Sequence, residues 1–154
     1  MTELSRAYYR ERAYQILESR EHSTYELRQK LMRRGCPSEM ADSISEELSA
    51  AGLLDDVRFG IMYMRSKFRQ NWSVKRVESE LRKKHQIFGE TFEQVRQRYA
   101  EDCLGDSLES DDERAGRIAE RRCHKPGDAE KVFRYLLNHG FSVSCAKRVL
   151  QPYR

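Results

Sequence analysis

The same helical frame occurs three times along this 154-residue chain. Each frame has a polar residue that can cap a helix, two apolar residues one turn apart, and a terminating position. The sets, spaced by four residues, are Ser23, Leu27, Leu31 and Gly35; Ser73, Val77, Leu81 and His85; and Asp128, Val132, Leu136 and Gly140. A short polar residue at the start and glycine at the end are typical helix boundaries. The spacing alone is common in helices, but the shared boundary chemistry indicates an internal repeat.

Each repeated helix has a helical segment before and after it, such as 8–20 and 37–51 around the first frame. We therefore expect an all-α chain of nine short helices in three tandem three-helix repeats. The predicted units are residues 1–54, 55–104 and 105–154. Because units of this size are near the lower limit for independent folding, neighbouring units should stack.

Composition favours an elongated array over one thick core. Charged residues make up 35% of the chain and the mean hydropathy is −0.87, so apolar side chains are spread thinly. No window approaches the ~18 apolar residues of a membrane span, and the first residues lack the apolar core of a signal peptide. The four cysteines form no C-x-x-C pair. We therefore expect free thiols, buried in the fold, and a cytoplasmic location.

An acidic segment separates the second and third units. Residues 105–113 contain five acids and no base, which is typical of a flexible linker. Its last three residues, Asp111 to Glu113, also favour the start of the next helix, because acidic side chains are stabilised at helix N-termini.

Positive charge concentrates in residues 65–84, which hold eight Lys or Arg against two Glu. Before this stretch, Asp55 and Asp56 are placed to cap a helix. The spacing of that helix predicts an inward face; its residues are Phe59, Met62, Tyr63 and Ser66.

The helix after Ser73 shows how this charge is arranged. At 100° per residue, an apolar side of Val74, Val77 and Leu81 opposes a basic stripe. The stripe consists of Lys75, Arg76, Arg82 and Lys83. It fits either a solvated face or a surface for phosphates or an acidic protein groove. The candidate binding residues of the whole stretch are Arg65, Lys67, Arg69, Lys75, Arg76, Arg82, Lys83 and Lys84.

Motifs of catalysis and cofactor binding do not occur in the sequence. There is no phosphate-binding loop, dinucleotide fingerprint, H-E-x-x-H or G-x-S-x-G. The four histidines, His22, His85, His124 and His139, lie near predicted helix ends, where capping or solvent exposure is expected. We expect no catalytic residue, metal site or cofactor, and hence a protein that is not an enzyme.

The segment Gly52-x-Leu54-Asp55-Asp56-x-Arg58-Phe59-x-x-x-Tyr63 is the most specific motif of the sequence. It is similar to the G-x-L-[DN]-D-x-R-[FY]-A segment of the RecX family of recombinase regulators, which the chain resembles. Matches at Ser23 to Gly35 and Tyr135 to Phe141 extend the resemblance over nearly the whole chain. Departures are Gly60, where alanine is usual, and His85-Gln86, where the family prefers glycine and an apolar residue.

This resemblance implies an elongated, curved, all-α array, monomeric or nearly so. It implies a regulator that binds RecA and RecA–single-stranded DNA filaments in DNA repair and the SOS response, with weak binding to DNA alone. Family members inhibit the ATPase, strand-exchange and coprotease activities of RecA. The alternative is a helix-turn-helix DNA-binding protein acting without RecA. Its reading helix in the first unit would be 37–51, which carries four acids and no Lys or Arg.

Overall fold

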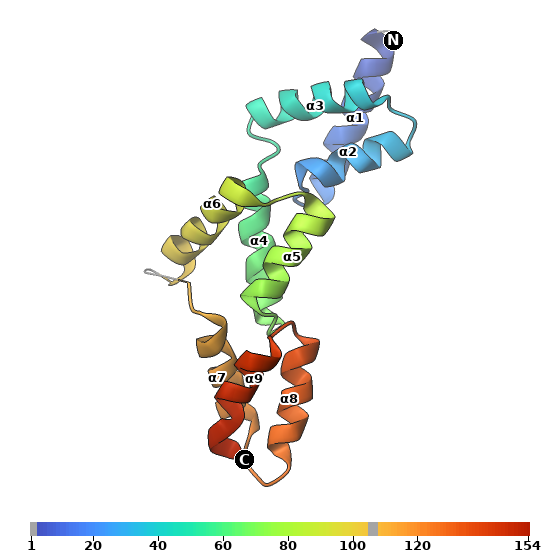
Figure 1. The fold of residues 1–154 in the computed structure, drawn as a ribbon. Coiled ribbons are helices and arrows are strands. Elements are labelled where there is room, and N and C mark those ends of the chain that lie inside the picture. The colour runs from blue at the N-terminus through green and yellow to red at the C-terminus, as the bar shows by residue number, and fades with distance from the viewer. Residues whose placement is uncertain (1–2, 105–107) are drawn as a thin grey trace.

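The computed structural model describes residues 3–104 and 108–154, and in those residues it contains nine α-helices and no strand. The helices are α1 (Glu3–Ser19), α2 (Thr24–Arg33), α3 (Ser38–Ala50), α4 (Asp56–Arg69), α5 (Val74–His85), α6 (Gly89–Tyr99), α7 (Asp111–Arg122), α8 (Asp128–Asn138) and α9 (Val143–Leu150). A π-helical turn, Ala100–Leu104, follows α6, and a 3₁₀ turn, Gln151–Tyr153, follows α9. Together they form the elongated, curved all-α array expected from the sequence (Figure 1).

The helices group in threes around three clusters of buried side chains. Both apolar residues of every frame lie in these clusters: Leu27 and Leu31, Val77 and Leu81, Val132 and Leu136. The frames therefore identify the middle helices α2, α5 and α8. The boundaries at residues 54 and 104 stay a prediction, and residues 105–107 of the predicted linker lie outside the described residues.

Two of the three predicted helix starts are confirmed. The hydroxyl oxygens of Ser23 and Ser73 accept hydrogen bonds from the backbone N–H groups of the third residues of α2 and α5, Glu26 and Arg76. Asp128 is not a cap, because Gly127 occupies that position and Asp128 begins α8. Its carboxylate instead accepts from the N–H groups of His124 and Lys125, closing the preceding loop.

The predicted inward face of α4 was partly wrong. Phe59 is buried, but Met62 is 47% exposed, and the other buried positions of this helix are Gly60, Met64 and Phe68. Gly60 explains why the buried face of α4 differs from the predicted one, because a Cβ there would lie 2.5 Å from a methyl of Val95 on α6. The missing side chain thus lets α6 pack directly against this side of α4.

A junction joins the first and second units end to end. The C-terminus of α5 meets the N-terminus of α2, where His85 Nδ1 lies 2.8 Å from the Ser23 hydroxyl. Asp55 caps its own helix, whereas an oxygen of Asp56 accepts from the backbone N–H of Thr24 at 2.7 Å. Asp56 therefore supplies a cap to α2 in the preceding unit.

The second junction repeats this arrangement. Asp111, at the start of α7, accepts from the N–H groups of Val74 at 2.7 Å and Lys75 at 3.3 Å. The backbone N–H of Ser73 donates to the carbonyl of His139, so the C-terminus of α8 meets the N-terminus of α5. Each middle helix is thus stacked on the one before it, as the run of α2, α5 and α8 in Figure 1 shows.

Replacing Asp111 with alanine should lower the free energy of unfolding by about 0.5–2 kcal/mol, the usual cost of a lost helix cap. The neighbouring Asp112→Ala is the control, because the Asp112 carboxylate interacts with the Cys145 thiol and the exposed Arg148 and caps no second helix; a surface pair of this kind is worth about 0–1 kcal/mol. Urea denaturation of both variants measures the difference. Equal losses would contradict the capping role of Asp111.

Cys36 and Cys145 are buried, Cys103 and Cys123 half-buried, and all four are free thiols. Burial raises the pKa of Cys145 to about 12.

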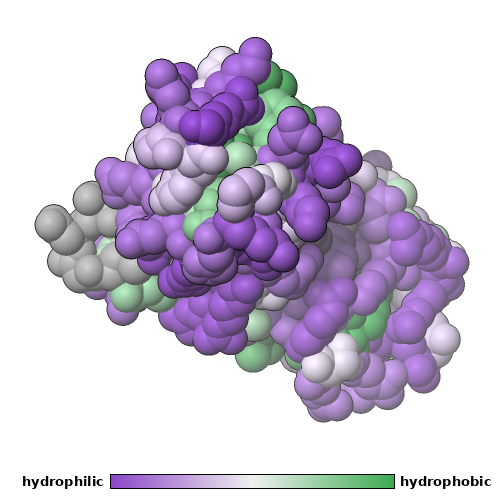
Figure 2. Space-filling model, turned by 90° about the horizontal axis from the view of Figure 1, so that it is seen from below, coloured by the Kyte–Doolittle hydropathy of each residue, from purple (hydrophilic) through white to green (hydrophobic). Residues whose placement is uncertain are grey.

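In the part of the chain that is described, no helix is both long and apolar enough to traverse a bilayer. Hydrophilic residues cover most of the face in Figure 2, with hydrophobic residues in small separate areas.

Candidate functional site

The structure divides the eight predicted binding residues among three environments. Arg65 and Arg69 line hollows shared with α7. Lys67 and Arg76 pack on Trp72. The others lie along α5: Lys75, Arg82, Lys83 and Lys84. The positive charge of this stretch is therefore spread around the second unit rather than gathered on one face.

Arg76 is a structural residue of the second junction. Its guanidinium carbon lies 3.7 Å from the centroid of the Trp72 ring, and its Nη1 donates to the carbonyl of Asn138 at 2.9 Å. Lys67 also lies over Trp72, at 4.6 Å. Arg76 is half-buried, because the end of α8 lies over the first turn of α5; its role as a binding residue stays a prediction.

The remaining stripe consists of Lys75, Arg82 and Lys83, all exposed. Opposite them, Val77 and Leu81 are completely buried, so the predicted amphipathic arrangement of α5 is confirmed. Lys84 pairs with Glu80 one turn away, which lowers its availability to a partner. Arg82 lies over the ring of Phe88, which is 54% exposed. An exposed cation beside an exposed ring suits a polyanion with flat bases.

Sequence reasoning missed the arginines of α7. Arg114, Arg117 and Arg121 line the two hollows that also contain Arg69. Their spacing of three and four residues places them on one helical face, so the pattern was visible in the sequence. The sequence did not show that this face lies beside Arg69, which precedes it by more than 40 residues.

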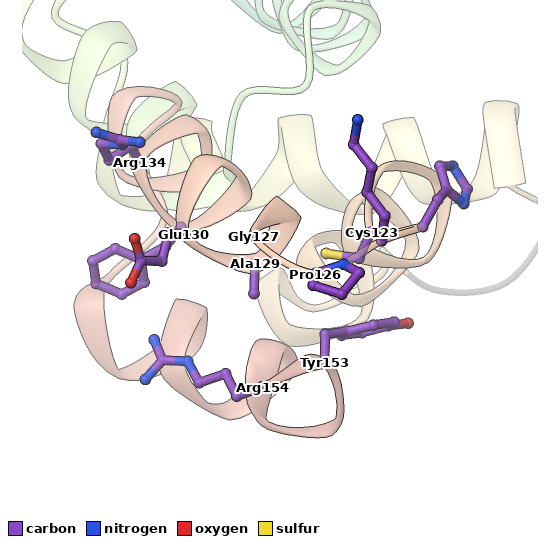
Figure 3. A pocket seen from close by; sticks show the side chains of 11 residues that line it. Cys123, Pro126, Gly127, Ala129, Glu130, Arg134, Tyr153 and Arg154 are labelled. Atoms are coloured by element: carbon purple, nitrogen blue, oxygen red, sulfur yellow. The ribbon is translucent and has the colours of Figure 1, made fainter.

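A wide cavity lies in the third unit, between the α7–α8 loop, α8 and the C-terminal turn (Figure 3). Its volume is about 1010 Å³, and its lining includes Pro126, Ala129, Phe133 and Tyr153. The lining side chains also include one carboxylate, Glu130, and three cations: Lys125, Arg134 and Arg154. No group of three His, Cys, Asp or Glu suited to a metal ion occurs among residues 3–104 and 108–154.

Two histidines, His22 and His85, lie near the first junction. Burial lowers the pKa of both His22 and His85. The His22 ring lies between the carbonyl of Arg20, which accepts from Nδ1–H at 2.9 Å, and the ammonium of Lys30, which donates to Nε2 at 2.7 Å. His22 is fully buried, so the expectation that it faces solvent or caps a helix was wrong.

These histidines should make the protein less stable as the pH falls from about 7 to 5. Their folded pKa values lie below the unfolded value of about 6.5, so the unfolded chain binds more protons below that pH and stability declines. Carboxylates with lowered pKa, such as Glu26, contribute at still lower pH. Denaturant melts across this range should show a shallower decline for a His22→Gln, His85→Gln variant. A parental slope in that variant would contradict the assignment.

Comparison with known proteins identifies the family. The regulatory protein RecX of Prosthecochloris aestuarii is 31% identical over 142 residues, covering 90% of this chain and 89% of the relative. The chain belongs to the RecX family. The family model "RecX, first three-helix domain" matches residues 10–48. A crystal structure of RecX from Lactobacillus salivarius has the same fold, with a TM-score of 0.70, 18% identity and 96% coverage of each chain.

Other matches to RecX regulatory proteins are shorter. The alignment with RecX of Vibrio cholerae is 33% identical over 75 residues and spans about half of that protein, 49% of its length. The departures from the RecX motif have structural explanations. Gly60 admits Val95, as described above. Gln86 ends α5 in the left-handed conformation, with φ of 52°, and His85, at the family's glycine position, packs against Phe59 with 4.6 Å between ring centroids.

Proposed function

We propose that this RecX-family protein is a regulator, not an enzyme, that binds RecA and RecA–single-stranded DNA filaments. Binding lowers the ATPase, recombinase and coprotease activities of RecA in DNA repair and the SOS response. The observation that carries the proposal is the alignment with a RecX regulatory protein over nine-tenths of the chain. The protein acts in the cytoplasm as a monomer.

The shape of the array supports this proposal. Three units held end to end by capped junctions form an extended body that can follow a groove on a filament (Figure 1). Exposed cations on the middle unit, such as Lys75, Arg82 and Lys83, are available to DNA phosphates and to acidic protein surfaces. Contacts along the body would bridge neighbouring parts of the filament and so oppose the changes that accompany ATP turnover.

The helix-turn-helix alternative is less well supported. In the first unit, α3 presents acidic side chains and no Lys or Arg, so it would repel a phosphate backbone. Two of those acids are already paired, Asp42 with Arg28 and Glu47 with Arg6. Tight, sequence-dependent binding to duplex DNA without RecA would favour this alternative.

Salt dependence separates the two functions. Each phosphate contact with a single strand contributes about 0.7 to the log–log slope of affinity against salt. Contacts with RecA bury apolar and hydrogen-bonded area that salt affects less. Fluorescence anisotropy between about 50 and 200 mM salt should show weak, salt-sensitive binding to free DNA and tighter, more salt-tolerant binding to the filament. Equal affinities and slopes would mean that DNA alone is the ligand.

A further inference from the structure

We propose that the cleft between α4 and α7 binds the phosphodiester backbone of single-stranded DNA. This inference rests on the proposed function and assigns its DNA contact to residues outside the stripe of α5. The cleft, here called the arginine cleft, is defined by Arg65, Arg69, Arg114, Arg117 and Arg121.

Two adjoining hollows form the arginine cleft. They have volumes of about 250 and 190 Å³, and both are lined by Phe68, Arg69, Arg114 and Arg117. Arg65 extends the first hollow and Arg121 the second. Residues from the second and third units therefore meet in one concave, cationic surface, because the junction places the start of α7 beside the end of α4.

Arg114 is the buried centre of this surface. It is 8% exposed, its guanidinium carbon lies 3.9 Å from the centroid of the Phe68 ring, and its Nη2 donates to the carbonyl of Trp72 at 2.9 Å. The carboxylates of Asp111 and Glu109 act on it electrostatically, but none of the ion pairs found in the described residues involves Arg114, and its Nε has no hydrogen-bond partner there. A buried cation with an unused donor is costly unless an anion approaches it.

The cleft has more positive charge than its own carboxylates neutralise. Glu109 pairs with Arg117 and is the one acid in the lining of the two hollows. Arg65 donates to the sulfur of Cys103 and not to a carboxylate. Among the described residues, Arg69 and Arg121 have no side-chain hydrogen bond or ion pair. Such excess charge raises the local concentration of anions.

The arrangement suits a chain of phosphates better than a single anion. Arg114, Arg117 and Arg121 follow one face of α7, with steps of about 4.5 and 6 Å along the helix axis. Successive hollows lie along the same face. Guanidinium groups bind phosphate oxygens in a bidentate manner, and a row of them matches a repeating backbone charge.

The test compares two double variants of the full chain with equal loss of charge. The cleft variant is Arg69→Gln with Arg121→Gln, which removes two cations without breaking a side-chain hydrogen bond or ion pair of the described residues. The control variant is Arg98→Gln with Lys147→Gln, two exposed cations outside the cleft. Binding of a fluorescein-labelled oligothymidylate is measured across a salt series without RecA.

The proposal predicts that the salt slope of the cleft variant falls by about 1.4, or about 0.7 for each lost contact. The control variant should keep the parental slope. Equal changes in both variants would overturn the proposal, because binding would then depend only on the total positive charge of the protein. Inorganic phosphate at constant ionic strength is tested on the parent protein as well. If it raises the stability of the parent while both variants have equal oligothymidylate slopes, the cleft binds a free anion and not DNA. Because this experiment contains no RecA, a negative result would overturn the DNA site alone. The proposed regulation of RecA is tested by a separate experiment.

Discussion

Phe59→Ala is expected to lower the free energy of unfolding by about 3–5 kcal/mol, the usual cost of truncating a buried phenylalanine. Phe59 is 6% exposed and belongs to the core of the second unit. Its ring also packs against Tyr63 and His85, with centroid distances of 5.9 and 4.6 Å. The same substitution should therefore weaken both the core of this unit and the junction with α2.

Met62→Ala provides the matched control for Phe59. Both residues lie on α4, but Met62 is largely exposed, so its truncation should change the free energy of unfolding by no more than about 0.5 kcal/mol. Urea denaturation measures stability, and RecA ATP hydrolysis measures function. A Phe59→Ala protein with parental stability and no effect on RecA would show that the ring is a contact residue and not part of the core.

Gly140→Ala is expected to disrupt the second junction. Gly140 has φ of 95°, and an added Cβ would lie 2.4 Å from Cβ of Arg76 and 2.7 Å from the Ser73 hydroxyl oxygen. The left-handed conformation costs a residue with a side chain about 1–3 kcal/mol. Overlap with packed neighbours typically adds about 1–3 kcal/mol. Both contributions should appear as a lower unfolding midpoint in urea.

Gly127→Ala separates these two contributions. Gly127 has nearly the same φ, 93°, but nothing lies within 4 Å of a Cβ added there. Its variant should therefore show the backbone strain without the overlap, and should be less destabilised than Gly140→Ala. Equal losses in the two variants would mean that overlap of the added methyl group with Arg76 and Ser73 costs no stability.

The three frames predicted the fold because their information is local. A capping serine, two apolar residues and a terminating glycine act within one helix, so Ser23, Leu31 and Gly35 have the same roles in any environment. The frame beginning at Asp128 was the exception, since the turn at Gly127 begins the helix one residue earlier than a capping aspartate would.

The contacts between units could not be predicted in this way. Asp56 and Asp111 cap helices that begin more than 30 residues earlier in the chain. Arg76 has the helical position of a surface cation, yet the end of α8 covers it. Similarly, Arg69 and Arg114 become neighbours only when the third unit docks on the second. Local periodicity contains no information about such docking.

Steady-state ATP hydrolysis by RecA on single-stranded DNA, with and without this protein, tests the central claim most directly. We expect hydrolysis to fall as the protein is added, and to fall less with a Lys75→Gln, Arg82→Gln, Lys83→Gln variant, whose substitutions leave the core intact because Val77 and Leu81 face the opposite side. Unchanged hydrolysis at saturating protein, with folding verified by its denaturation midpoint, would contradict a role in regulating RecA.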